Sequence, residues 1–393
     1  MSKSGVAQYV DGAIDYAISN NRLVGAVVLA AVDGEFVYRR AAGMADREVQ
    51  SPMRENSIFR LASVTKPMVS ATALSLIEDG RLSLTGPITR WLPTFKPKTV
   101  DGHTPEITLH HLLTHTAGLD YGFDDQLPAY RDAGISTGLE QPGLGLNEAI
   151  ERLSVMPLVY KPGTNWRYSL AIDVVGAVVE RAANAPLADV LRERITGPLD
   201  MSDTGFEVTD AARLATPYRD GMPEPELMSD GDMVKNLLGP IAFSPSRIFD
   251  ANSYQSGGAG MVGTAPEFLR FLEVVRTGGR PILGDEGHRM ITEPALPTGV
   301  SIGEAGWDHG MAGPILKDNS WARGFHGIGT WRGGGAYGHY WFVDPINKLS
   351  FVCFTNTAFE GCDGPAVLNI RDALYRAISE TRQTSKDHSK PGI

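Results

Sequence analysis

The chain has 393 residues, of which 42% are hydrophobic and 21% charged, a composition typical of a globular protein with a large core. Its formal net charge is −10 and it has no basic stripe with interleaved aromatic residues, so we expect neither nucleic acid nor a membrane surface as a partner. The length indicates two domains, or one large domain that carries an insertion.

The cysteines and the N-terminal residues indicate the cellular compartment in which the protein works. Cys353 and Cys362 do not make a disulfide framework, and Cys353 lies in an apolar run typical of a buried strand. The first residues lack the apolar stretch of a signal peptide, and no uninterrupted apolar run of about 18 residues follows. We therefore expect a cytoplasmic enzyme. We expect no metal and no organic cofactor, since neither zinc-ligand spacing nor a Gly-rich phosphate loop is present.

The first 80 residues predict a helix, a hairpin and a second helix. Apolar residues recur at helical spacing over 5–20. Two β-branched, apolar runs flank Asp33-Gly34, which is a strong signal for a two-residue hairpin turn. The apolar run that follows Ser63 predicts a helix over 63–79.

From about Leu82 to Asp250, helical patterns alternate with loops rich in Pro and Gly, and strand patterns become scarce. We expect four helices here, over 109–118, 147–153, 171–183 and 187–195. We also expect a long loop over 120–146 and irregular surface structure over 217–248, and both segments should border a substrate cleft.

Strand patterns return near the C-terminus, after a helix over 266–276. The expected strands cover 321–328, 338–343 and 349–356, and a last helix over 365–380 precedes a polar, disordered tail from Thr381.

Strands at both ends with helices between them predict an α+β fold. Its single antiparallel sheet is built from both termini and flanked by the terminal helices. On this interpretation residues 1–80 and 251–393 form the sheet domain, and 81–250 form a mostly helical inserted domain.

The tetrad Ser63-Val-Thr-Lys66 is the first candidate for chemistry. Residues three apart lie on one face of a helix, so Ser63 and Lys66 can touch. A buried lysine with a lowered pKa can take the serine proton and make the hydroxyl a nucleophile. Roughly one such tetrad arises by chance in a chain of this length, and a helix start with a solvated lysine explains it equally well.

Two further segments offer groups that such a serine needs. Tyr168 precedes the helix expected over 171–183, where a tyrosine beside a buried cation can exchange a proton with the serine; an aromatic anchor of the turn is the alternative. The glycine run before His339 lets backbone N–H groups approach an oxyanion; a flexible loop or bulge, with an ordinary strand histidine, is the alternative.

A second serine lies in a motif of another hydrolase class. Gly299-Val-Ser301-Ile-Gly303 matches the nucleophile elbow, whose serine stands on a tight turn between a buried strand and a helix. The residues before this pentapeptide do not form a strand pattern, and those after it do not form a helix pattern. We therefore interpret the match as accidental.

Five motifs in this order resemble those of serine hydrolases with the class C β-lactamase fold, and above all those of the family VIII carboxylesterases. They are Ser63-Val-Thr-Lys66, Leu112-Leu-Thr-His115-Thr-Ala-Gly118-Leu119, Pro162-Gly163 through Tyr168-Ser169, Ser256-Gly-Gly-Ala-Gly260-Met261 and Tyr337-Gly-His-Tyr-Trp341-Phe342. The resemblance implies a β-lactamase-like fold, an acyl-enzyme on Ser63, and Lys66 and Tyr168 as proton-transfer groups.

The resemblance also implies an oxyanion hole and a substrate-binding box. The backbone N–H groups of Ser63 and Ala336 would hold the oxyanion. Family esterases often carry Trp-Gly-Gly where penicillin-recognising relatives carry Lys-Thr-Gly, whereas this chain has the longer Trp331-Arg-Gly-Gly-Gly335. The substrate-binding positions implied around this box are Trp331, Gly334, Gly335, Tyr337 and His339.

Two departures from the β-lactamase pattern bear on the substrate. Leu170 stands where β-lactamases usually place an asparagine that holds the substrate amide, and the cationic Lys-Thr-Gly is absent. We therefore predict a serine carboxylesterase for small, short-chain esters. The alternatives are a β-lactamase, a D-amino-acid amidase or a DD-peptidase on the same fold, and a non-catalytic descendant that only binds. We expect Tyr168, with its pKa lowered by Lys66, to be the base; Lys66 itself is the alternative.

Overall fold

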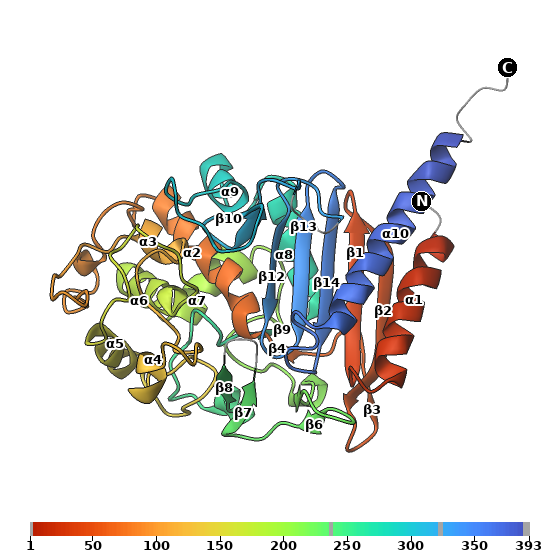
Figure 1. Cartoon of the computed structure of the whole chain (residues 1–393), viewed down its shortest axis with the longest axis horizontal. Coiled ribbons are helices and arrows are strands. Elements are labelled where there is room, and N and C mark those ends of the chain that lie inside the picture. Colours follow the sequence, from red (N-terminus) through yellow and green to blue (C-terminus); the bar gives the residue numbers. More distant parts are fainter. Residues whose placement is uncertain (1–2, 236–238, 321–324, 388–393) are drawn as a thin grey trace.

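The computed structural model describes residues 3–235, 239–320 and 325–387. Across these residues the centre is an eight-stranded antiparallel sheet in which N-terminal and C-terminal strands are neighbours (Figure 1). In spatial order its strands are β10 (Trp307–His309), β11 (Pro314–Leu316), β12 (Trp331–Gly335), β13 (His339–Asp344), β14 (Leu349–Thr355), β1 (Gly25–Val32), β2 (Glu35–Asp46) and β3 (Ser51–Pro52). The predicted α+β fold, with one sheet built from both termini, is confirmed.

Helices cover both faces of this sheet. Alternate side chains of β1 enter two different cores: Val28 packs with α1 (Lys3–Ser19) and α10 (Pro365–Asp387), whereas Val27 belongs to the core on the opposite face. Figure 1 shows α1 and α10 side by side on one face and α8 (Ala265–Arg276) on the other. Burial of both faces explains why β1 is a continuous apolar run.

The predicted hairpin joins β1 to β2. Asp33 and Gly34 both have positive φ angles, 53° and 86°, as a two-residue turn of this twist requires. On the other side of β1, Val28 pairs with Cys353 of β14, and the side chain of Cys353 is fully buried as predicted.

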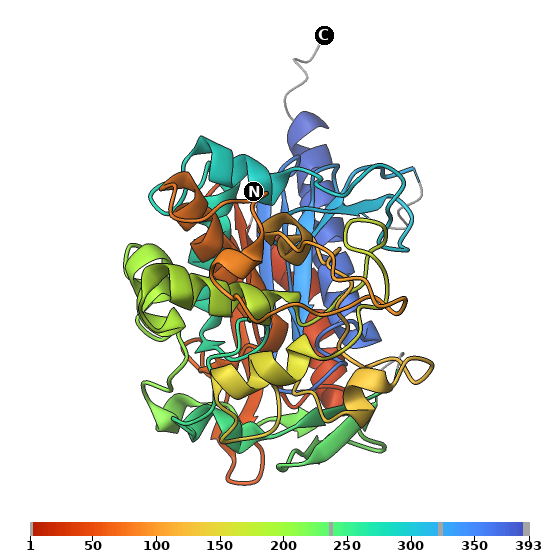
Figure 2. The same cartoon turned by 90° about the vertical axis from the view of Figure 1, so that its left-hand side faces the viewer.

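The remaining helices gather beside the β10–β12 end of the sheet, and Figure 2 shows this helical side from the front. They are α2 (Thr65–Glu78), α3 (Leu109–Leu113), α4 (Ala129–Asp132), α5 (Leu146–Ser154), α6 (Ala171–Ala183), α7 (Leu187–Leu191), which continues as a π turn over Arg192–Thr196, and α9 (Asp285–Thr292). The central one is α2, whose residues from Thr65 to Leu76 are all buried. A helix that is buried all round has no polar face, and this explains the apolar run after Ser63.

Short strands replace irregular structure in the described part of the segment expected over 217–248, of which residues 236–238 lie outside the description. They are β5 (Tyr218–Arg219), β6 (Glu226–Leu227), β7 (Asp232–Lys235) and β8 (Pro240–Phe243), and they form two small ribbons. Strands of two to four residues leave too few alternating positions for a sequence pattern. The loop expected over 120–146 contains the single-turn helix α4.

Two expectations near the C-terminus were wrong. A strand was expected over 321–328, but residues 325–328 are not a strand, and 321–324 lie outside the described part. The strand in this region is β12, which the sequence does not predict because glycine is rare in strands. The tail expected to be disordered from Thr381 continues α10 to Asp387, and this part of α10 projects past the sheet (Figure 1). Residues 388–393 lie outside the described part. The division into domains stays a prediction.

Candidate active site

Ser63 lies in a tight turn immediately before α2. The turn is a 3-10 segment, Ala62–Val64, so α2 begins at Thr65 and not at residue 63 as expected. Ala62 is fully buried and has a φ of 45°, a left-handed conformation that costs a residue with a Cβ roughly 1–2 kcal/mol. This strained turn presents the Ser63 side chain to a cavity next to α2.

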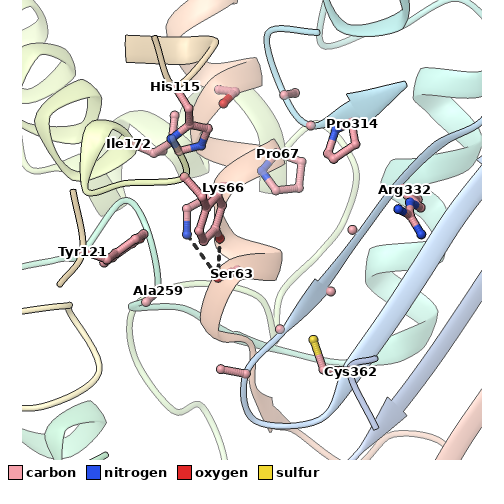
Figure 3. Close-up of a pocket in the computed structure, with 18 of the residues that line it drawn as sticks. Ser63, Lys66, Pro67, His115, Tyr121, Ile172, Ala259, Pro314, Arg332 and Cys362 are labelled. Carbon is pink, nitrogen blue, oxygen red and sulfur yellow. Dashed lines mark hydrogen bonds between the residues drawn. The ribbon is translucent and has the colours of Figure 1, made fainter. Parts of the chain in front are cut away.

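The structure brings Ser63, Lys66 and Tyr168 together. Figure 3 shows Ser63 and Lys66 side by side in the cavity. The Nζ of Lys66 donates a hydrogen bond to the Oγ of Ser63 at 3.1 Å. The OH of Tyr168, which stands just before α6, donates to the same oxygen at 2.7 Å. One serine oxygen therefore contacts two groups that can exchange protons with it.

Burial shifts the pKa values of Lys66 and Tyr168 in opposite directions. Lys66 is 6% exposed, and burial lowers its pKa to about 7, although the nearby Asp173 carboxylate raises it. Burial raises the pKa of Tyr168, against a smaller lowering by the hydrogen bond to Ser63. The expectation that Lys66 lowers the pKa of Tyr168 was therefore wrong, because the loss of solvation of the phenolate outweighs the hydrogen bond that lowers this pKa.

A turn over residues 256–260 holds Lys66 from the other side. The Nζ of Lys66 donates to the carbonyl oxygen of Gly258 at 2.8 Å. Ser256 fixes this turn, because its Oγ donates to the buried carboxylate of Asp173 at 2.5 Å and accepts the N–H of Ala259 at 3.0 Å. Gly258 has to be glycine, since a Cβ there would lie 2.4 Å from Asp173. The glycine-rich motif of the sequence thus positions the lysine.

Replacing Asp173 by asparagine should move the acidic limb of the pH profile of kcat/KM to lower pH, by roughly one unit. The Asp173 carboxylate raises the pKa of Lys66, so without this charge Lys66 loses its proton at a lower pH. The measurement is the pH dependence of p-nitrophenyl butanoate hydrolysis. Asp285→Asn is the matched control, because it removes an almost fully exposed carboxylate that does not line the cavity and should leave the limb in place. If the acidic limb of the pH profile does not move in Asp173→Asn, this electrostatic role is contradicted.

The end of β12 forms the wall opposite Ser63. Gly333, Gly334, Gly335 and Ala336 all line the cavity. A Cβ on Gly335 would lie 2.4 Å from the carbonyl oxygen of Leu61, so only glycine lets the strand approach the serine turn this closely. Within the described residues, no acceptor takes the backbone N–H of Ser63 or of Ala336. Both donors are thus available for an oxyanion.

Three of the implied substrate-binding residues do not reach the cavity. Trp331 is 2% exposed, and its Nε1 donates to a carbonyl oxygen within the core. His339 is fully buried, with its Nε2 2.7 Å from the carbonyl oxygen of Arg60. Tyr337 packs against Phe243 in a separate cluster. The side chains at these positions fill the core, whereas Gly334 and Gly335 line the cavity as expected.

Two tryptophans that the sequence reasoning did not assign to the substrate site do line the cavity, Trp166 and, from β13, Trp341. Trp341 pairs with Gly333 across β12 and β13, and a Cβ on Gly333 would lie 2.6 Å from its indole ring. The ring therefore covers the position that Gly333 leaves empty. A glycine directly opposite a tryptophan was the available signal, but it needed the strand register to be recognised.

The cavity itself has a volume of about 330 Å³. Side chains of the two loops expected to border the cleft line it, Phe123 and Leu139 from the first and Ile241 from the second. Ser301 does not: it lies in an exposed loop and its Oγ accepts the N–H of Gly303 at 3.1 Å. Among the described residues, no cluster of three or more His, Cys, Asp or Glu side chains can hold a metal ion, and no helix is long and apolar enough to cross a membrane.

A helix-flanked antiparallel sheet, with a serine and a lysine at the start of a buried helix and a tyrosine hydrogen-bonded to that serine, is typical of β-lactamase-like serine hydrolases. The family model described as Beta-lactamase matches residues 6–375. The chain belongs to the beta-lactamase family.

Relatives within this family indicate which kind of hydrolase the chain is similar to. Esterase EstB of Burkholderia gladioli is 44% identical over 382 residues, which cover 95% of this chain and 96% of EstB. The structure of EstCE1, described as a hydrolase with promiscuous acyltransferase activity, has a TM-score of 0.91 and 41% identity, and the match covers 95% of this chain and 99% of EstCE1.

A more distant structure, a mutant of simvastatin synthase from Aspergillus terreus, has a TM-score of 0.77 at 23% identity and covers 97% of this chain and 98% of its own, a likeness of fold alone. The predicted family and the predicted enzyme class, an esterase-type hydrolase, are confirmed.

Proposed function

We propose that the protein hydrolyses short-chain carboxylic esters through an acyl-enzyme on Ser63. One observation carries this proposal: the Ser63 Oγ accepts hydrogen bonds from both Lys66 and Tyr168 inside a cavity whose other walls are mainly apolar. The likeness to EstB, an esterase by name, supports an ester as the substrate.

In the first step Lys66 takes the proton of Ser63 while the Oγ attacks the ester carbonyl. With a pKa of about 7, Lys66 is partly neutral at neutral pH and can accept this proton. Tyr168 keeps its own proton, since burial raises the pKa of its OH. We therefore assign the base to Lys66, which the sequence reasoning held as the alternative.

In the second step the tetrahedral intermediate collapses and the alcohol leaves. The backbone N–H groups of Ser63 and Ala336 hold the oxyanion. Tyr168 donates its proton to the departing alkoxide oxygen and regains one from Lys66, so the charge of the pair is restored. A water molecule then attacks the acyl group, its proton passes to the same pair, and Ser63 is regenerated.

The charges around the cavity favour a neutral substrate. Apart from Lys66, the cation among the described lining residues is Arg332, which forms an ion pair with Glu304 and stacks on the ring of Trp307 at 3.9 Å. Arg332 is thereby partly neutralised. A β-lactam carboxylate would find no free cation here, and the buried side chain of Leu170 offers no amide to hold a substrate amide.

We expect kcat/KM for p-nitrophenyl butanoate to exceed that for nitrocefin by more than roughly tenfold, because a missing charged contact costs at least about 1.4 kcal/mol. Parallel assays with p-nitrophenyl acetate and octanoate would measure the limit on acyl length. If nitrocefin is turned over faster than the butanoate, the protein is a β-lactamase and the proposed function fails.

A further inference from the structure

Two histidines of the cavity wall have no role in the steps above. His115 and His309 both line the cavity that contains Ser63, and each is 2% exposed. Their rings meet edge to face with centroids 5.4 Å apart, and the ring of His115 lies 4.9 Å from that of Tyr168. In Figure 3, His115 lies next to Lys66 on the side away from Ser63.

Hydrogen bonds fix the tautomer of each ring. The backbone N–H of Ser169 donates to the Nδ1 of His115 at 3.3 Å, so Nδ1 carries no proton and Nε2 does. The Nδ1 of His309 lies 2.6 Å from the carbonyl oxygen of Gly310, which can only accept. His309 therefore carries its proton on Nδ1 and has a free lone pair on Nε2. One ring offers a donor and the other an acceptor.

Both rings stay neutral over the working range of pH. Burial lowers the pKa of His309 to about 4, and burial together with the nearby His309 and Lys66 lowers the pKa of His115 well below its ordinary value. The donor and the acceptor are thus fixed features of the wall, and they add no charge to it.

Neither Nε2 has a hydrogen-bond partner within the described part of the chain. Neither Nε2 is among the described side-chain atoms that are both fully enclosed and unpaired, so both atoms are open to the space of the cavity. On the neighbouring wall Leu113, Ala312 and Pro314 are apolar, and Trp166, whose ring lies beside both histidines, makes no hydrogen bond to either of them. Water, or a substrate group that displaces it, is the remaining source of partners.

We propose that His115 and His309 form a subsite that binds a hydroxyl group of the substrate. A hydroxyl oxygen accepts a hydrogen bond from the Nε2–H of His115 and donates one to the Nε2 of His309. A carboxylate cannot donate, an ammonium group cannot accept, and a methyl group does neither. This inference rests on the proposed function in one respect, that the ester occupies this cavity. It specifies esters with a hydroxyl group on the alcohol or the acyl chain.

Matched ester pairs test this subsite, because a hydroxyl group replaces a methyl group of similar size in each pair. 2-Hydroxyethyl butanoate is compared with propyl butanoate for the alcohol side, and ethyl 4-hydroxybutanoate with ethyl pentanoate for the acyl side. In at least one pair we expect the ratio of kcat/KM, hydroxy ester over alkyl ester, to be about tenfold higher in the wild type than in His309→Leu. The ratio within one variant is independent of any change in its overall activity.

A second variant protects the test against misfolding of the first. His309→Gln keeps an amide acceptor and should retain part of the preference. The inference is overturned if the wild type shows no preference for the hydroxy ester in either pair, or if both variants keep the full preference. Failure of the proposed function is a separate result, namely no hydrolysis of propyl butanoate or ethyl pentanoate by the wild type.

Discussion

Replacing Ser63 by alanine should lower kcat/KM for p-nitrophenyl butanoate by at least about 10⁴-fold, because no acyl-enzyme can form without the Oγ. The loss should fall on kcat, since the cavity walls remain. Alanine keeps the Cβ and removes only the oxygen of a partly exposed side chain, and Lys66 keeps its hydrogen bond to the carbonyl oxygen of Gly258. The fold should therefore survive, and near-ultraviolet circular dichroism checks this.

The matched control for this serine is Ser301→Ala. Ser301 has the sequence context of a nucleophile but lies in an exposed loop, where its Oγ caps the N–H of Gly303. We expect its activity to stay within the error of the wild type. Loss of activity in Ser301→Ala, with Ser63→Ala unaffected, would transfer the chemistry to the elbow pentapeptide and contradict the assignment.

Replacing Tyr168 by phenylalanine should lower kcat by roughly 10²- to 10⁴-fold, the usual effect of removing a general acid or base. The reason is its position: its OH lies 2.7 Å from the Ser63 Oγ and keeps its proton. If Tyr168 protonates the leaving group, the loss should be larger for ethyl butanoate than for p-nitrophenyl butanoate, because nitrophenolate leaves without a proton.

A buried tyrosine outside the cavity provides the comparison. Tyr130 donates its OH to the carbonyl oxygen of Pro157 at 3.0 Å, and Tyr130→Phe should leave kcat nearly unchanged. If Tyr168→Phe loses the same factor in kcat for both esters, Tyr168 acts in a step before the alcohol leaves. It would then be the base that the sequence first suggested.

The sequence predicts those features of the fold that arise from local chemistry. Asp33-Gly34 predicts its hairpin because few other residues adopt two successive positive φ angles. Ser63 and Lys66 are predictable as a pair because helical spacing brings them together, and Tyr168 because it begins a recognisable helix. The apolar runs of β1 and β14 predict strands buried on both faces.

Long-range packing decides the features that the sequence does not predict. The glycine box predicts a ligand-binding loop, yet the side chains of Trp331 and His339 belong to the core. Trp341 reaches the cavity because the residue opposite it on the neighbouring strand is Gly333, which has no side chain. The raised pKa of Tyr168 depends on burial, which no motif records. His309 stands in a strand of three residues, too short for any periodic pattern.

The most direct test of the central claim is covalent labelling with a p-nitrophenyl alkylphosphonate, followed by digestion and mass spectrometry. The phosphonate traps the nucleophile of a serine esterase as a stable ester. We predict one adduct per chain, on the peptide that contains Ser63, with no labelling of Ser63→Ala. An adduct on Ser301, or an active protein that remains unlabelled, would contradict an acyl-enzyme on Ser63.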